Sequence, residues 1–253
     1  EGPILPKVPL LSRFNHAITY VPEFKLYLDS TNPWARFGQL PEGDLGAPVL
    51  LTRDAKLART PGSDEQPVKS ALSVDFVFDK AGNLHGQTER RLSEVEEIDL
   101  RGYFSQINRQ NRAQAEASIM SASGIDGSGE VAMNSDPLDL KKQFGYRFRF
   151  KADDYVDFGV VGGMTLPNPP GGKSFRTLYT TTPAPDNETP FYCSAQRYDE
   201  TYRLQLPANV PIIAIPQDRQ FRNAAGDYRV AWRRDGQQVI VNHRLQVNAI
   251  RGK

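Results

Sequence analysis

Alternating apolar and polar residues predict β-strands over most of the chain. Two segments, "ALSVDFVFD" and "FGYRFRFKA", have an apolar residue at every second position, which places those residues on one face of a strand. The apolar positions are Leu72, Val74, Phe76, Phe78, Phe144, Tyr146, Phe148 and Phe150. After the first segment, "DKAGN" predicts a turn and "LHGQTERRL" predicts the returning strand.

The clearest hairpin is predicted within "DYRVAWRRDGQQVIVNHRLQV". Asp235-Gly236 is a two-residue turn signal between two alternating segments. A turn centred there places three pairs of residues opposite one another on one face of the hairpin. The pairs are Trp232 with Val239, Val230 with Val241, and Tyr228 with His243.

One helix is predicted among the strands, at about residues 96–122. Ser93 followed three residues later by Glu96 is a capping-box signal, and Gly124 predicts the helix end. The stretch between is rich in Ala, Gln, Arg and Glu, with a few apolar anchors.

The fold class is therefore mainly β, with a predicted domain boundary in "RTPGSDEQPVK" at 59–69. Residues 1–62 form one predicted part. Residues 66–253 are expected to form an antiparallel β-sandwich-like domain that carries the helix.

Composition narrows the classes of partner. Lys plus Arg (31) nearly balances Asp plus Glu (30), so nucleic acid is not an expected partner. No stretch approaches 18 consecutive apolar residues, so no membrane span is predicted. One cysteine excludes an internal disulfide, and no two of the three histidines have zinc-motif spacing. No metal and no cofactor is predicted.

The stretch "RFNHAITYVPEFKLYLDSTNPW" places a histidine and an aspartate on two short predicted strands, 14–21 and 24–31. A turn centred on Pro22-Glu23 would set His16 directly opposite Asp29. A carboxylate beside an imidazole fixes its tautomer and favours its charged form, as a thiol or hydroxyl nucleophile requires. A purely structural His–Asp pair is the alternative interpretation.

"FNHAITYV", "YLDST" and the "FGQLP" that follows Trp34 together resemble the final third of a bacterial transglutaminase-like core, which has a papain-like α+β fold. The resemblance implies that His16 is the general base and then acid, with Asp29 as its orienting partner. It also implies a protein or peptide amide as substrate. The later chain is similar to the C-terminal β domain of bacterial envelope proteins, which implies a periplasmic location.

The nucleophile of such a site is not evident in this sequence. In the family a cysteine at a helix start precedes the histidine, whereas only 15 residues without cysteine precede His16. We expect that the chain begins inside the transglutaminase-like domain, is inactive alone, and has the missing N-terminal part as a partner. Cys193 follows a predicted strand entry and is interpreted as structural. Trp34 either walls the cleft or plugs a domain interface.

A second function is consistent with the same sequence. Residues 66–253 would be a non-catalytic binding or scaffolding module of the bacterial cell envelope, recognising a protein, peptide or glycan. In that case the His16–Asp29 pair would be a structural remnant.

Overall fold

The structure is a computed structural model that describes residues 14–62, 68–107, 110–172, 174, 191–193, 195–248 and 250–252. It is mainly β, as the sequence predicts. In the described part of the chain, no helix is both long enough and apolar enough to cross a membrane.

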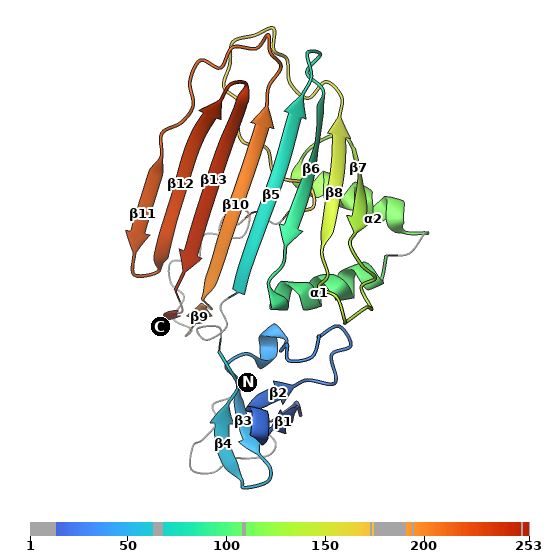
Figure 1. Ribbon diagram of the computed structural model, residues 1–253, viewed down its shortest axis with the longest axis vertical. Helices are drawn as coiled ribbons and strands as arrows, with labels where there is room; N and C mark the ends of the chain where they lie inside the picture. Colours follow the sequence, from blue (N-terminus) through green and yellow to red (C-terminus); the bar gives the residue numbers. More distant parts are fainter. Residues whose placement is uncertain are drawn as a thin grey trace.

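A single eight-stranded sheet dominates the molecule (Figure 1). Its strands, in spatial order, are β11 (Arg219–Asn223), β12 (Gly226–Asp235), β13 (Gln238–Val247), β10 (Gln196–Gln205), β5 (Val68–Phe78), β6 (Leu84–Arg91), β8 (Tyr146–Ala152) and β7 (Ser128–Met133). Neighbouring strands are antiparallel except β5 and β10, which are parallel.

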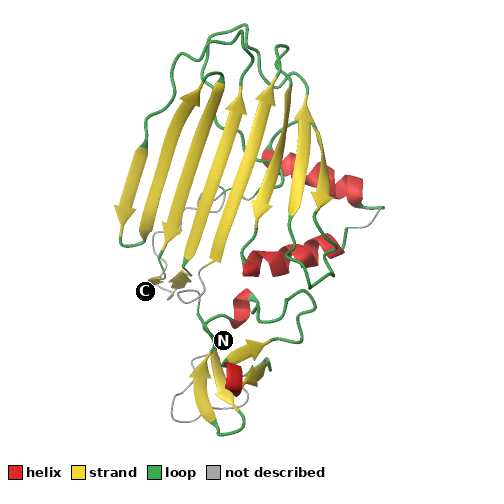
Figure 2. Ribbon diagram, viewed as in Figure 1, coloured by secondary structure: helices red, strands yellow, loops and turns green. Residues whose placement is uncertain are grey.

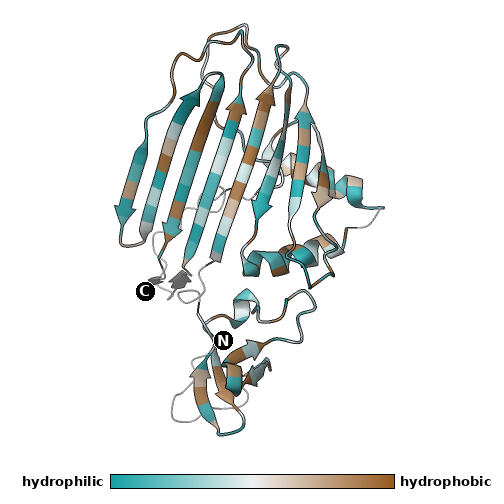
Figure 3. Ribbon diagram, viewed as in Figure 1, coloured by the Kyte–Doolittle hydropathy of each residue, from teal (hydrophilic) through white to brown (hydrophobic). Residues whose placement is uncertain are grey.

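Two helices, α1 (Glu94–Ser105) and α2 (Arg112–Ser123), accompany the sheet. Figure 2 shows α2 crossing behind β8 and β7, and α1 at the end of β6 and β8. Phe104 of α1 and Met120 of α2 are buried in the same core cluster as the apolar strand residues. All eight alternating apolar residues predicted from the two segments are buried. Figure 3 shows the resulting alternation of hydrophobic and hydrophilic positions along the central strands.

The sandwich-like arrangement predicted for 66–253 is wrong. The parallel pairing of β5 with β10 joins both halves of the domain into one sheet, and the helices cover part of one face. Alternation along a strand shows that one face is buried, but it does not identify the element that covers that face. The domain boundary stays a prediction, because residues 63–67 lie outside the described residues.

The single helix predicted at 96–122 is instead two helices. The predicted capping box is present: the Glu96 amide donates to Ser93 Oγ, and the Ser93 amide donates to Glu96 Oε2. Helix α1 ends in a tight turn, in which the Ile107 amide donates to the Phe104 carbonyl at 3.1 Å. The sequence after Ile107, "NRQN", offers no apolar side chain that a continuous helix would bury.

The small part before the sheet contains two short hairpins. Strands β1 (Thr19–Val21) and β2 (Leu26–Leu28) form the first, and β3 (Pro48–Leu51) and β4 (Lys56–Arg59) form the second. A short 3₁₀ turn, η3 (Glu42–Asp44), precedes β3. Figure 1 shows this part beyond the end of the sheet, on the side of α1.

Both predicted hairpin registers are wrong by two residues. In the first hairpin Val21 pairs with Leu26, because the 3₁₀ turn η2 (Pro22–Phe24) and a left-handed Lys25 (φ 51°) lengthen the loop. In the second, Asp235 pairs with Gln238, so Gly236 (φ 59°) is the first residue of the turn and not the second. A slip of two leaves every side chain on its predicted face.

Candidate functional site

His16, Asp29 and Asp44 meet in the small N-terminal part. His16 lies just before β1, Asp29 directly follows β2, and Asp44 ends η3. His16 Nε2 is 3.3 Å from Asp29 Oδ2 and 3.8 Å from Asp44 Oδ2. One donor atom from each residue lies within 4.8 Å of the other two. The predicted contact of His16 with Asp29 is therefore present, although it lies outside the β1–β2 ladder.

Asp29 is held in place by the residue two positions later. Thr31 donates twice to Asp29 Oδ1, from its amide at 2.9 Å and from its hydroxyl at 2.7 Å. This local turn leaves Oδ2 directed at the imidazole, and the side chain of Asp29 is only 4% exposed. Burial raises the pKa of Asp29, but the Thr31 hydrogen bonds and the contact with His16 outweigh it, so the pKa lies below its usual value.

Asp44 is the residue of this site that sequence reasoning missed. Its amide donates to the Pro41 carbonyl at 3.0 Å, and its own carbonyl accepts from the buried Thr60 hydroxyl, so its backbone is fixed. Among the described residues, its buried Oδ2 atom has no hydrogen-bond partner. Burial, and then the negative charge of Asp29, raise the pKa of Asp44 above its usual value. Of the two carboxyl groups, that of Asp44 is therefore protonated first as the pH falls.

The orientation of His16 determines which nitrogen is available for chemistry. Nε2 faces the two carboxylates, so Nδ1 is the nitrogen that can exchange a proton with a nucleophile. The His16 side chain is 39% exposed, so an approaching group can reach it. Both carboxylates therefore approach the same ring nitrogen, Nε2.

Trp34 packs against helix α1. A Cβ atom at Gly102 would lie 3.2 Å from Trp34 Cε3, so the indole lies directly on the backbone of α1. This is the position expected of an aromatic plug between two parts of the chain. The cleft-wall role of Trp34 stays a prediction. The sequence signal for this contact was Gly102, since a glycine inside a helix can allow another side chain to approach the helix backbone closely.

A buried ionic network beside Trp34 ties the N-terminal part to α1. Glu97 and Arg101 are both fully buried and form an ion pair at 2.7 Å. Arg36 Nε lies 3.3 Å from Glu97, and Gln39 Nε2 donates to it at 3.4 Å. The two parts of the chain therefore share a polar core as well as the indole contact.

In the structure Cys193 belongs to a strand and not to the start of a helix. Its backbone belongs to β9 (Phe191–Cys193), which pairs with β14 (Ile250–Gly252), as the predicted strand entry suggested. The side chain of Cys193 lies outside the described residues.

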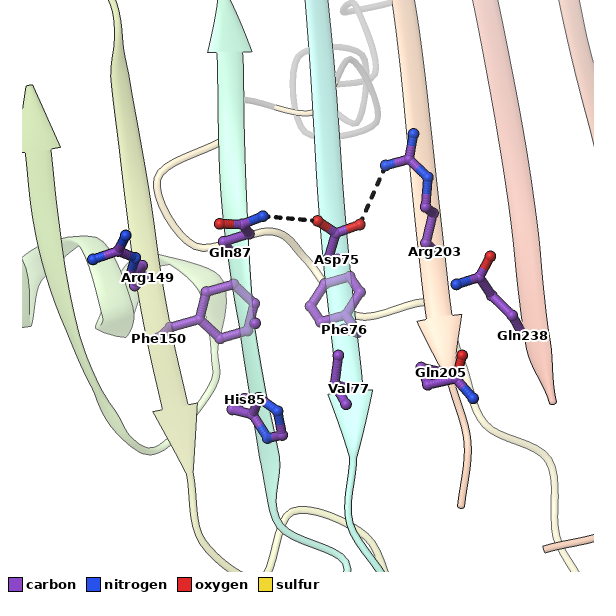
Figure 4. Close-up of a pocket in the computed structure, with 11 residues that line it drawn as sticks. Asp75, Phe76, Val77, His85, Gln87, Arg149, Phe150, Arg203, Gln205 and Gln238 are labelled. Carbon is purple, nitrogen blue, oxygen red and sulfur yellow. Dashed lines mark hydrogen bonds and ion pairs between the residues drawn. The ribbon is translucent and has the colours of Figure 1, made fainter. Parts of the chain in front are cut away.

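A second candidate site lies on the sheet face opposite the core. Figure 4 shows a hollow there between polar side chains of β5, β6, β8, β10 and β13. Its volume is about 570 Å³. Asp75 at its centre accepts from Gln87 at 3.0 Å and from Arg203 at 3.2 Å. Other outward side chains at the hollow are those of Val77, His85, Arg149, Gln205 and Gln238.

This open face has an excess of positive charge. The strand registers place eleven cationic and six acidic side chains of the described sheet on it, whereas the whole chain has a net charge of only +1. The cationic residues are Lys69, Arg91, Arg147, Arg149, Lys151, Arg197, Arg203, Arg222, Arg229, Arg233 and Arg244. The acidic residues are Asp75, Glu89, Glu130, Asp199, Asp227 and Asp235. The nearly neutral net charge of the whole chain therefore does not reveal that this face of the sheet is basic.

Together, fold and site define a mainly β protein with an imidazole–dicarboxylate cluster in a small part beside one large mixed sheet. No protein-family model, no curated protein and no solved structure matches the chain.

Proposed function

We propose that His16 and Asp29 are the imidazole–carboxylate pair of a transglutaminase-like thiol enzyme, which transfers or hydrolyses an amide acyl group. The observation that carries this proposal is the 3.3 Å contact of His16 Nε2 with a nearly buried, Thr31-anchored Asp29. The resemblance of "FNHAITYV" and "YLDST" to the end of a papain-like transglutaminase core supports it.

In the proposed reaction the nucleophile is a cysteine from a part of the parent protein that this sequence does not contain. The thiolate attacks the amide carbonyl while His16 Nδ1, having taken the thiol proton, returns it to the leaving amine. Asp29 stabilises the resulting imidazolium through Nε2. The substrate is a protein or peptide amide, and a bacterial periplasmic location follows from the same resemblance.

Alkylation of the parent protein by iodoacetamide tests this coupling. With an intact pair, the cysteine is a thiolate at low pH, so the alkylation rate should stay high down to about pH 5. In His16→Ala the rate should instead rise with an apparent pKa of about 8.5. His85→Ala, which changes an exposed histidine on the sheet, is the matched control. An unchanged pH profile in His16→Ala would contradict the proposal.

The second candidate function is a binding module, and the basic open face of the sheet favours it. Its rows of arginine, glutamine and asparagine side chains fit an anionic polysaccharide, whose carboxylates or sulfates pair with arginine and whose hydroxyls bond to amides. The interspersed acidic residues make a densely charged nucleic acid a poorer fit.

Retention on heparin-agarose tests this second function. The double variant Arg149→Gln/Lys151→Gln should elute at a clearly lower salt concentration than the wild type, because fewer counterions are released on binding. The control, Lys25→Gln/Arg53→Gln, removes the same charge from exposed positions of the N-terminal part. Equal elution of the two variants would exclude a role for the sheet face.

A further inference from the structure

We propose that His16, Asp29 and Asp44 bind a divalent transition-metal ion of the zinc type. Sequence spacing gave no sign of such a site, because the three residues come from three separate irregular segments. The inference that binding regulates catalysis rests on the proposed thiol chemistry, whereas the inference of binding itself does not.

The distances suit a shared ion. Zinc bonds to imidazole nitrogen and carboxylate oxygen at about 2.0–2.2 Å, so ligand atoms around a tetrahedral ion lie about 3.4 Å apart. The separations from His16 Nε2 are 3.3 Å to Asp29 and 3.8 Å to Asp44. The two carboxylate oxygens are within 4.8 Å of each other. Three protein ligands would leave one position open, which water or a competing ligand can fill.

The electrostatics of the cluster also favour a cation. Two carboxyl groups share a small, largely buried space, and His16 Nε2 lies within ion-pair distance of both. The buried Oδ2 of Asp44 has no hydrogen-bond partner among the described residues, which is a costly arrangement for a polar atom. A divalent ion bonded to both carboxylates and to a neutral imidazole would balance the two negative charges, which otherwise repel each other. It would also coordinate Asp44 Oδ2 and so give this buried oxygen a partner.

The surroundings of the ligands resemble a supported metal site. Thr31 donates to the other oxygen of Asp29, and such outer hydrogen bonds orient ligating carboxylates. The fixed backbone of Asp44 limits its movement. The nitrogen ligand selects zinc-type ions over magnesium and calcium, which prefer oxygen ligands alone.

Metal binding at Nε2 would remove this nitrogen from Asp29. In the proposed enzyme the ion would therefore inhibit thiol chemistry, because the imidazolium that Asp29 stabilises cannot form while a metal holds the same nitrogen. Zinc availability would then regulate the site.

Titration of the metal-free chain with ZnCl2 by isothermal calorimetry tests the binding. We expect one zinc per chain, no binding of MgCl2, and an affinity at least about tenfold lower in both His16→Ala and Asp44→Asn. Glu42→Gln, in the same short turn, and His85→Ala, an exposed histidine elsewhere, should bind as the wild type does. Thermal melting of each variant confirms that it is folded.

Absence of zinc binding by the wild type, wild-type affinity in a folded Asp44→Asn, or equal losses in the controls would each overturn the inference. Its failure differs from failure of the proposed function. Zinc binding is measured on this chain alone, whereas the coupling of His16 to a thiol is measured by iodoacetamide on the parent protein.

Discussion

If the proposed thiol chemistry is correct, replacing His16 by alanine is expected to lower kcat/KM for amide acyl transfer by a factor of up to about 10⁴. In the proposed mechanism the variant lacks the group that takes the thiol proton and returns it to the leaving amine, and it also lacks the cation that would stabilise the thiolate. His85→Ala removes a histidine without touching the cluster and should retain wild-type activity. Steady-state kinetics on a glutamine-containing peptide would give the ratio.

Two substitutions of Asp29 should lower the rate by different amounts, because this side chain is proposed to orient His16 and not to transfer a proton itself. Asp29→Asn keeps one side-chain oxygen, which can accept a hydrogen bond from His16 Nε2 but cannot accept from the Thr31 amide at the same time, so its loss of rate should lie between zero and that of Asp29→Ala. Both losses should appear mainly in kcat, because neither side chain is expected to contact substrate. A His16→Ala variant within tenfold of wild-type activity, or an Asp29→Ala variant as active as the wild type, would contradict the assigned roles.

The sequence predicted which face of each strand is buried, but it did not predict which strands pair with one another. Alternation correctly identified the buried positions of β5 and β8, because a period of two depends only on the strand itself. The pairing of β5 with β10 joins residues more than a hundred positions apart, and no local pattern encodes it. For that reason a single mixed sheet could not be distinguished from a sandwich.

The candidate site was likewise predicted only in part. The turn between β1 and β2 was misread because Lys25 adopts a left-handed conformation that its residue type does not suggest. The predicted contact of His16 with Asp29 is present although neither residue belongs to the β1–β2 ladder, because the irregular segments that flank the two short strands bring the side chains together. Asp44 belongs to an irregular segment without periodicity, so only the folded chain brings it to the histidine.

The burial of the Glu97–Arg101 pair could not be predicted from the sequence. Glu97 and Arg101 are four residues apart on α1, and such a pair usually lies on an exposed helix face. Here the N-terminal segment covers Glu97, while backbone carbonyls of the segment before β8 accept from Arg101. Burial of this pair is a tertiary effect that the charges of one helix cannot reveal.

Replacing Glu97 by alanine is therefore expected to destabilise the protein by about 3–5 kcal/mol. The side chain accepts from Arg101 and, at 2.9 Å, from the Phe144 amide, and it also faces Arg36. Its removal leaves the guanidinium of Arg101 fully buried without a countercharge, which costs far more than the pair itself contributes. Urea unfolding followed by circular dichroism measures the loss.

Glu94→Ala, at an exposed position in the first turn of the same helix, should cost no more than about 1 kcal/mol, so it controls for helix propensity and the helix dipole. The double variant Glu97→Leu/Arg101→Leu should lose less stability than the two single variants combined, because neither fully buried charge of the pair is left without the other. Arg36 and Gln39 attach to Glu97 from the segment that runs between Asp29 and Asp44. A folded Glu97→Ala protein should also bind zinc more weakly than Glu94→Ala if these two contacts help to hold the segment that connects Asp29 to Asp44. Equal stability of the Glu97 and Glu94 variants would show that the network does not connect the two parts of the chain.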